Sequence, residues 1–301
     1  MSHANRSAEG AILFHGHKVW YRVVGSRSAP GKLPLLCLHG GPGVAHDYLE
    51  PLEMIASSGR EVIFYDQLGC GNSDQPNAPS LWTVGLFLDE IGAVREALGL
   101  SELHLFGHSW GGMLAMEYAL TQPSGLASLI LASAPASIPQ LTAEMQRLLT
   151  ELSPDVQETI RRHEEAGTTD NPAYQEAMMV FYSRHLCRVE PFPDCLNRSF
   201  EKLMRNPEVY HTMWGPSEFC ATGFLKDWDV AARLNEIPLP TIITSGRHDE
   251  ITPASVDTVH RGIAESRWEI FEESSHMAHL EEADRYLHVI NGFLEEIEAR
   301  A

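Results

Sequence analysis

The feature that most constrains this chain is a serine flanked by glycines, at the point where an apolar run meets a helical pattern. The apolar run is Leu103–Phe106, and the segment after it reads Gly-His-Ser-Trp-Gly-Gly over residues 107–112. In this context the serine sits on a sharp, strained strand-to-helix turn, and its hydroxyl projects from the sheet edge. A Cβ at Gly107 or Gly111 would collide with neighbouring elements. We therefore interpret Ser109 as a nucleophile, the alternative being a glycine-rich turn without chemistry.

Short apolar runs alternate with helical patterns along most of the chain. Continuous apolar runs are typical of strands that are buried on both faces. Their alternation with helices predicts an α/β fold, in which helices flank a mostly parallel central sheet. The predicted strands are an exposed edge strand at Lys18–Val24 and buried strands at Leu35–Leu38, Val62–Tyr65, Leu103–Phe106, Leu129–Leu131, Thr241–Thr244 and Trp268–Phe271; the predicted helices are Thr83–Leu98, Gly111–Thr121, Pro253–Ala264 and Ala283–Ala299.

Residues from Ile138 to Arg233 break this rhythm, because they contain helical stretches and several prolines but no convincing strand. We expect a helical cap domain over residues 138–233, inserted between two strands of a core domain that comprises residues 1–137 and 234–301. A chain of 301 residues is long enough to bury one large core. The helices predicted within the cap are Leu141–Leu152, Pro154–Ala166 and Tyr174–Leu186.

A serine hydroxyl is a weak nucleophile, so it needs an adjacent base and an acid that orients the base. When the serine occupies a strand-to-helix turn of this kind, the acid and then the histidine follow it along the chain. Asp249 follows the predicted strand Thr241–Thr244, and His276 follows the last predicted strand. Glu250 is the alternative acid and His279 the alternative base, each less favoured by its position.

Stabilising an oxyanion requires two backbone N–H groups that point at one spot. The N–H of Trp110 follows the serine at a helix N-terminus and provides the first donor. The glycine-rich segment 39–43 follows the strand Leu35–Leu38, and we expect Gly41 to supply the second donor. Gly40 and Val44 are less favoured alternatives, and the segment could also be a Pro-Gly turn without a catalytic role.

The composition excludes several classes of partner. The chain carries 22 lysines and arginines against 41 aspartates and glutamates, a formal charge of −19. Such a surface repels phosphate backbones and anionic lipid, so we expect neither nucleic acid nor membrane as a partner. The five cysteines are scattered, odd in number and without CxxC spacing, which argues against a disulfide framework or a zinc site and favours a reducing cytoplasm. Residues 1–10 are polar and lack the apolar run of a signal peptide, so we expect a cytoplasmic protein.

Several motifs together resemble the proline iminopeptidases and related aminopeptidases of the α/β-hydrolase fold. The resemblance spans nearly the whole chain and looks closest to the branch of the tricorn-interacting aminopeptidase and the bacterial L-amino acid amidases. The motifs are His39-Gly40-Gly41-Pro42-Gly43, Asp66-Gln67-Leu68-Gly69-Cys70-Gly71-Asn72-Ser73, Gly107-His108-Ser109-Trp110-Gly111-Gly112, Gly215-Pro216-Ser217-Glu218-Phe219 and Gly246-Arg247-His248-Asp249-Glu250. We assign no chemistry to the segment 66–73 beyond a structured loop near the site.

The resemblance implies an exopeptidase that removes an N-terminal residue, often proline, or hydrolyses an amino acid amide, without metal or cofactor. It also implies that Glu218 and Glu250 hold the free amino group of the substrate, since paired carboxylates in a partly desolvated cleft suit an ammonium ion. Trp110, Trp214 and Phe219 are candidate walls of the pocket for the first residue. An esterase or lactonase on the same fold is the alternative, and a binding protein without turnover is a more distant one.

Overall fold

The computed structural model describes residues 7–27 and 29–300, so residues 1–6 of the polar N-terminal segment lie outside the described residues. Its strands form one sheet of eight in the order β1-β2-β4-β3-β5-β6-β7-β8. The pairs that involve β1 and β2 are antiparallel and all the others are parallel. The strands are β1 Ser7–Phe14, β2 His17–Gly25, β3 Leu35–Leu38, β4 Glu61–Tyr65, β5 Leu103–His108, β6 Leu126–Ala132, β7 Thr241–Gly246 and β8 Ser266–Phe271.

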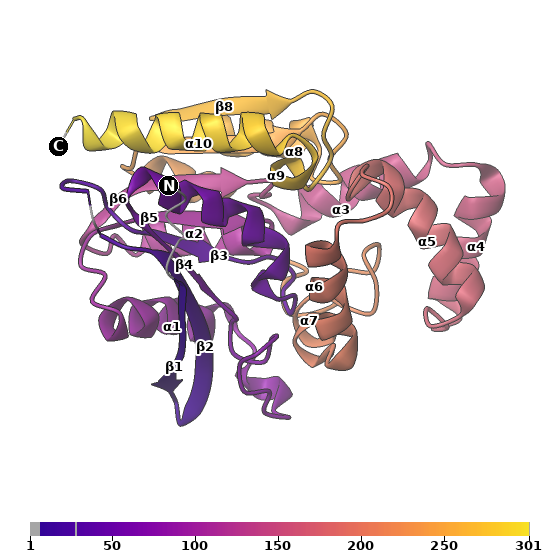
Figure 1. Cartoon of the computed structure of the whole chain (residues 1–301). Helices are drawn as coiled ribbons and strands as arrows, with labels where there is room; N and C mark the ends of the chain where they lie inside the picture. The colour runs from indigo at the N-terminus through magenta and orange to yellow at the C-terminus, as the bar shows by residue number, and fades with distance from the viewer. Residues whose placement is uncertain (1–6, 28, 301) are drawn as a thin grey trace.

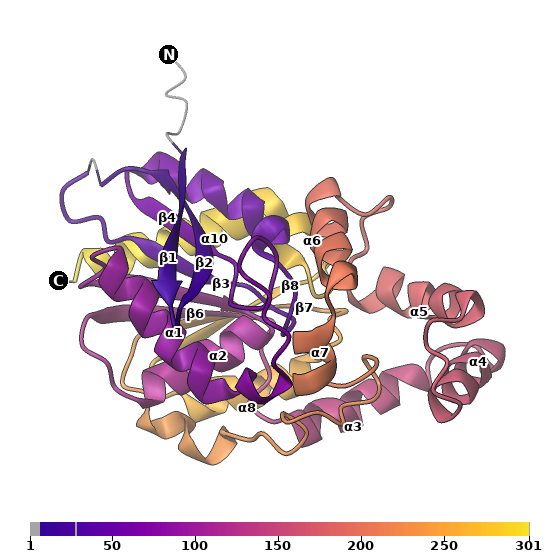
Figure 2. The ribbon, with the colours of Figure 1, turned by 90° about the horizontal axis from the view of Figure 1, so that it is seen from below.

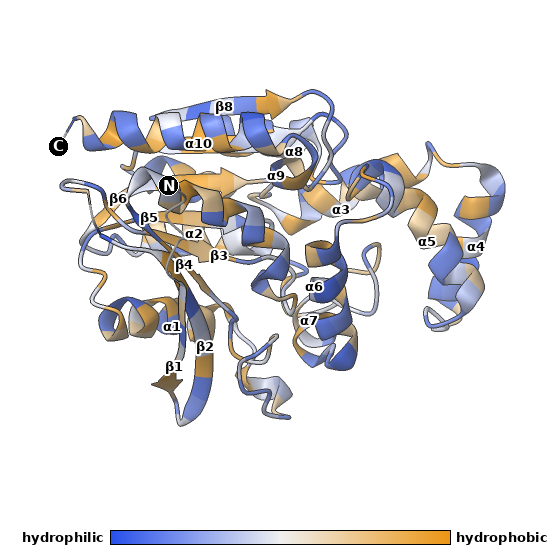
Figure 3. Ribbon diagram, viewed as in Figure 1, coloured by the Kyte–Doolittle hydropathy of each residue, from blue (hydrophilic) through white to orange (hydrophobic). Residues whose placement is uncertain are grey.

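The predicted fold class is confirmed, and a strand lies at each predicted position. The prediction that Lys18–Val24 is an edge strand is wrong, because β2 pairs with β1 on one side and with β4 on the other. Strand β1 was not predicted, because most of its side chains are exposed and its sequence begins with the polar residues Ser7 and Glu9. Such an outer strand is specified by pairing with β2 rather than by burial of its own side chains. Figure 3 shows a contrast within the sheet, since strand β3 in its middle is largely orange whereas the edge strand β8 is blue over most of its length.

Helices cover both faces of the sheet. In Figure 2, α1, α2 and α8 lie in front of the strands and α10 lies behind them. Alternate residues of β3 separate accordingly: Leu36 and Leu38 belong to the hydrophobic cluster under α1 and α2, and Leu35 and Cys37 to the cluster under α10. The helices and helical turns of the core are η1 His46–Ser58, η2 Pro79–Leu81, α1 Val84–Ala97, α2 Trp110–Leu120, η3 Ala231–Glu236, α8 Pro253–Gly262, α9 Ala278–Glu281 and α10 Ala283–Glu298.

Local sequence explains where several helices begin. The side chain of Thr83 accepts a hydrogen bond from the backbone N–H of Leu86 at the start of α1. Thr252 caps α8 in the same way, and Pro253 occupies the first helical position, where a missing N–H costs nothing. None of the helices in the described part of the chain is long and apolar enough to cross a membrane.

The segment between β6 and β7 is helical and projects from one end of the sheet (Figure 1). Its helices are α3 Ile138–Leu149, α4 Pro154–Glu165, α5 Pro172–His185, α6 Asp194–Arg205 and α7 Glu208–Met213. Helices α6 and α7 were not predicted: α7 is short, and α6 is strongly polar on its outer face. Each begins directly after a proline, α6 after Pro193 and α7 after Pro207.

The two connections to this segment run side by side. The Ile138 N–H donates to the Trp228 carbonyl and the Val230 N–H to the Ala136 carbonyl, each at 2.9 Å. We propose that residues 138–233 act as a cap domain over the carboxyl ends of the strands. The last residues of this range belong to η3, whose Leu234 is buried in the core against α8.

The approach of α2 to the sheet yields a test of the fold. A Cβ on Gly111 would lie 2.2 Å from the Leu38 carbonyl oxygen, whereas a Cβ on Gly292 of α10 would meet no atom within 4 Å. We expect Gly111→Ala to lower the free energy of unfolding by about 1–3 kcal/mol. The same substitution at Gly292 should raise it by about 0.4–1 kcal/mol, because alanine loses less backbone entropy in a helix. Urea denaturation followed by circular dichroism measures both, and equal effects would contradict the close approach.

Candidate active site

Ser109 lies between β5 and α2 in a backbone conformation that few residues other than glycine adopt. Its φ is 55° and its ψ is −121°, and its N–H donates to the Ala132 carbonyl at 2.9 Å. The crowding predicted for the flanking glycines is present, since a Cβ on Gly107 would lie 2.2 Å from the Gly111 carbonyl oxygen. Ser109 is half-buried whereas the residues on either side of it are buried. The turn therefore presents the serine hydroxyl at the carboxyl end of the sheet.

Asp249 and His276 come together from the loops that follow β7 and β8. The Nδ1 of His276 lies 2.8 Å from Oδ1 of Asp249, and both side chains are buried. Because the carboxylate accepts the Nδ1 proton, the Nε2 atom is the one free to take a proton. The same carboxylate oxygen accepts the Ile251 N–H at 2.8 Å, which fixes its orientation. His276 and Ser109 line the same cavity.

His279, the alternative base, is engaged elsewhere. It lies in α9, and its Nε2 atom donates to the Tyr48 carbonyl at 3.0 Å. Burial lowers the pKa of His279 to about 4, although its hydrogen bond to the carbonyl opposes that shift. The neutral imidazole of His279 therefore joins α9 to η1 through its hydrogen bond to the Tyr48 carbonyl. The geometry therefore favours His276 over His279, as the order of the loops had indicated.

The electrostatic environment of His276 is dominated by carboxylates. Burial alone would lower the pKa of His276, but the charge and hydrogen bond of Asp249 together with Glu250 and Glu218 raise it above its usual value. Oε1 of Glu250 lies 3.8 Å from Nε2 of His276. Burial in turn raises the pKa values of both Glu250 and Glu218. Three carboxyl groups thus surround one imidazole.

The two glutamates approach from different parts of the chain. Glu250 follows Asp249 in the core, whereas Glu218 lies in the loop after α7 and accepts a hydrogen bond from the Tyr210 hydroxyl at 3.0 Å. Both line the cavity that contains Ser109. Oε2 of Glu250 is buried and has no hydrogen-bond partner among the described residues. An unpaired buried carboxylate oxygen is a ready acceptor for a cationic donor. Tyr210 was not anticipated from the sequence, because nothing in its local pattern marks it.

The two loops that carry Gly41 and Trp110 are joined by Gln67. The Trp110 indole donates to Oε1 of Gln67 at 2.9 Å, and Nε2 of Gln67 donates to the His39 carbonyl at 2.9 Å. The backbone N–H of Gln67 also donates to Nε2 of His39 at 3.0 Å. The loop 66–73, to which the sequence assigned no chemistry, therefore holds both loops that carry the candidate oxyanion donors.

A second set of hydrogen bonds joins three loops of the site. The Gly40 N–H donates to the Tyr48 hydroxyl at 2.7 Å, and Nε2 of His108 lies 2.9 Å from the His276 carbonyl. Since a carbonyl only accepts, His108 carries its proton on Nε2, and its Nδ1 accepts from the Tyr48 hydroxyl at 3.0 Å. Burial lowers the pKa of His108 well below its usual value, so the imidazole stays neutral. One directed chain thus links the glycine loop, the serine turn and the histidine loop.

Two cavities meet at Ser109. The first cavity contains the predicted walls Trp110 and Trp214, together with Met145 of α3. Phe219, the third predicted wall, is not among the residues that line either cavity, because it packs against Phe181 of α5 with ring centroids 4.8 Å apart. The second cavity contains His276. Apolar walls of the first cavity that the sequence did not indicate are Met113, Leu141, Met145, Leu225 and Ile251.

Known proteins resemble this chain over almost its entire length. A family model described as alpha/beta hydrolase fold matches residues 34–283. The proline iminopeptidase of Saccharolobus solfataricus is 43% identical over 96% of this chain and 93% of that protein. The crystal structure of the Mycobacterium smegmatis proline iminopeptidase is 40% identical, covers 97% of this chain and 99% of its own, and superposes with a TM-score of 0.92. The crystal structure of VinJ is 44% identical, with a TM-score of 0.94 over 96% and 99% of the two chains.

The chain belongs to the proline iminopeptidase family. It is therefore an aminopeptidase of the α/β-hydrolase fold, as the motifs in its sequence had indicated. The match extends through the cap, so the shared region includes both the core loops and the segment that carries Glu218.

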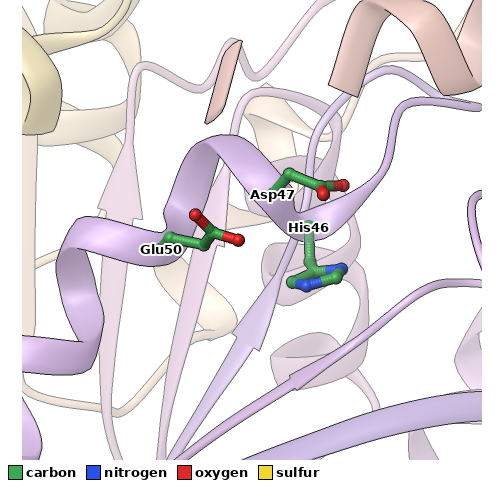
Figure 4. A group of neighbouring side chains, drawn as sticks. All are labelled: His46, Asp47 and Glu50. Carbon is green, nitrogen blue, oxygen red and sulfur yellow. The ribbon is translucent and has the colours of Figure 1, made fainter. Parts of the chain in front are cut away.

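Away from the site around Ser109, His46, Asp47 and Glu50 have ligand atoms within 4.8 Å of one another at the start of η1 (Figure 4). Each already has a protein partner. Nδ1 of His46 lies 2.8 Å from Oδ1 of Asp66, and Lys202 of α6 lies 2.8 Å from Oδ2 of Asp47. Glu50 pairs with Arg198 of the same helix. The group therefore joins α6 to the core, and we assign it no metal.

The hydrogen bonds of the Tyr48 hydroxyl predict that its removal lowers the catalytic rate, although Tyr48 is not proposed to act in the reaction. We expect Tyr48→Phe to reduce kcat about tenfold or more, because the Gly40 N–H and Nδ1 of His108 lose their shared partner and the loops they hold shift. An unpaired buried donor should also cost about 1–3 kcal/mol of stability.

Tyr65→Phe is the matched control, since the Tyr65 hydroxyl is buried without a hydrogen-bond partner among the described residues. Its removal should leave kcat and the melting temperature nearly unchanged. Steady-state kinetics and thermal denaturation of both variants decide the matter, and a Tyr48→Phe protein with wild-type kcat would contradict the positioning role.

Proposed function

We propose that the protein is a serine aminopeptidase that releases the N-terminal residue of peptides, or hydrolyses amino acid amides, through an acyl-enzyme on Ser109. The observation that carries the proposal is the meeting of Ser109, His276 and two glutamates in one cavity. A serine with a histidine–aspartate pair suits acyl transfer, and paired carboxylates beside it suit a substrate with a free ammonium group.

In the proposed reaction Nε2 of His276 takes the proton of the Ser109 hydroxyl while the seryl oxygen attacks the carbonyl carbon of the first residue. The backbone N–H groups of Gly41 and Trp110 hold the resulting oxyanion. His276 then gives the proton to the leaving amine, the C–N bond breaks and an ester remains on Ser109. Water attacks this ester with His276 again as base, and the free amino acid leaves.

The substrate ammonium is proposed to bind between Glu218 and Glu250. Glu250 offers the unpaired Oε2 atom, and Glu218 is held from the other side by Tyr210. The side chain of the first residue would then enter the first cavity, whose walls Trp110 and Trp214 suit a proline ring or a small apolar side chain. The proline iminopeptidases of similar sequence support proline as the first residue to test.

The proposal is tested against the esterase alternative by substrate chemistry. We expect aminoacyl 4-nitroanilides, headed by proline, and amino acid amides to be cleaved, and N-acetylation to lower kcat/KM by about a hundredfold or more, since a blocked amine leaves buried carboxylates unpaired. Ser109→Ala should lower kcat by about a thousandfold or more while the melting temperature is retained. Equal rates on free and acetylated substrates would favour an esterase, and an active Ser109→Ala protein would refute the nucleophile.

The carboxylate of Glu250 beside His276 predicts a shift in the pH dependence of the reaction. Hydrolysis of the uncharged ester 4-nitrophenyl acetate has no substrate amine to titrate, so the acid limb of its kcat/KM profile follows His276. Because Oε1 of Glu250 lies 3.8 Å from Nε2 of His276 and favours the imidazolium, Glu250→Gln should move that limb to lower pH by about 1–3 units.

Asp249 and Glu218 also favour the imidazolium and remain in the variant, whereas the neighbouring His108 and His279 are neutral because burial lowers the pKa of each. Glu272→Gln, at an exposed glutamate paired with Arg247, is the control and should leave the limb in place. A Glu250→Gln profile that coincides with the wild type would show that Glu250 does not act on the base.

A further inference from the structure

The two cavities at Ser109 differ in whether the catalytic histidine lines them, and this difference indicates which part of the substrate each would hold. Gly41, Ser109, Glu218 and Glu250 line both cavities, whereas His276 is among the lining residues of the second cavity and not of the first. In acyl transfer to serine, the imidazolium must protonate the departing amine, so the leaving group lies on the side of the serine that faces the imidazole. The second cavity is therefore on the leaving-group side, and this assignment rests on the proposed function.

The walls of the second cavity are mostly apolar and come from several elements. They include Leu196, Phe200 and Leu203 of α6, Val44 from the loop after β3, and Met277 next to the histidine. The three α6 residues are spaced at four and three positions, so they lie on one face of the helix. Val44, Phe200 and Leu203 are half-buried, so part of their apolar surface is available to a ligand.

Among the described residues, the second cavity contains no cation besides the catalytic histidine. Apart from His276, its ionisable lining residues include Glu218 and Glu250, and no lysine or arginine of the described part of the chain lines it. Two cations of α6 are engaged at η1, where Lys202 lies 2.8 Å from Asp47 and Arg198 pairs with Glu50, and Arg205 pairs with Glu201 of the same helix. A free carboxylate that entered this cavity would lose its hydration without gaining a lysine or arginine partner. It would also lie near two carboxyl groups, of which Glu250 already lies 3.8 Å from Nε2 of His276.

The α6 wall is held firmly in place. Besides the ion pairs, the Ser199 hydroxyl accepts the Tyr48 N–H at 3.0 Å and lies 3.1 Å from the Ala45 carbonyl, to which it donates. Ser199 is fully buried between α6 and η1. Figure 1 shows α6 beside α7 where the cap meets the core. A wall fixed in this way can select a ligand by shape, because it costs little ordering on binding.

We infer that the second cavity is a specificity subsite for the residue after the scissile bond, which accepts an apolar side chain and disfavours a carboxylate. A peptide or amide whose second residue is leucine-like should be a good substrate. An acidic second residue, or a dipeptide whose free carboxyl group belongs to the second residue itself, should be a poor one.

The test compares kcat/KM for prolinamide, Pro-Leu-NH2, Pro-Gly-NH2, Pro-Glu-NH2 and the dipeptide Pro-Leu, followed by release of free proline. Pro-Leu-NH2 should exceed Pro-Gly-NH2 by about tenfold, in keeping with burial of one leucine side chain. It should exceed Pro-Glu-NH2 and Pro-Leu by at least as much. Phe200→Ala should reduce the preference for leucine over glycine and leave the hydrolysis of prolinamide unchanged, because prolinamide has no second residue.

Met204→Ala is the matched control, since Met204 lies on the same helix but is 71% exposed. It should keep the wild-type preferences. Hydrolysis of prolinamide with no preference among the second residues, or a preference that Phe200→Ala does not change, would overturn the subsite and leave the proposed function standing. Failure to cleave every amine-bearing substrate would overturn the proposed function and the subsite with it.

Discussion

The close approach of helix α2 to the sheet at the turn that carries Ser109 is the constraint on which the rest of the site depends. A side chain at Gly107 or Gly111 would overlap backbone atoms, and Ser109 itself keeps a positive φ that costs conformational energy. Backbone hydrogen bonds to β6 and the first turn of α2 hold this conformation. Because the parallel strands end at the same edge, the loops after β3, β7 and β8 converge on that turn.

Convergence alone would leave the loops free to move relative to one another, and buried polar side chains remove that freedom. Gln67 joins the loops of Gly41 and Trp110, and Tyr48 with His108 joins the glycine loop to the loop of His276. Each of these groups is buried, so an unmade hydrogen bond would be expensive. The geometry around Ser109 is therefore determined by side chains that need not touch a substrate.

The cap contributes in two physically different ways. The loop after α7 brings a carboxylate, Glu218, next to Glu250 and His276, which sets the charge of the site. Helix α6 brings an apolar face. The helix is held to η1 by ion pairs from Arg198 and Lys202 to Asp47. Charge and apolar surface thus come from separate segments of the cap, so variation in one segment could change selectivity without disturbing the other.

The sequence by itself determined where the buried strands lie along the chain and which loops carry Ser109, Asp249 and His276, because apolar runs and chain order are local signals and parallel strands bring their carboxyl ends together. It did not reveal strand β1, helix α6, the roles of Gln67, Tyr48 and His108, or the contact that takes Phe219 away from the cavities. It ranked His276 above His279 by position, and the structure distinguishes them by their partners, since His276 bonds to Asp249 whereas His279 bonds to the Tyr48 carbonyl. These features depend on contacts between residues far apart in the chain, which leave no periodic trace in the sequence, so the tertiary structure alone decided them.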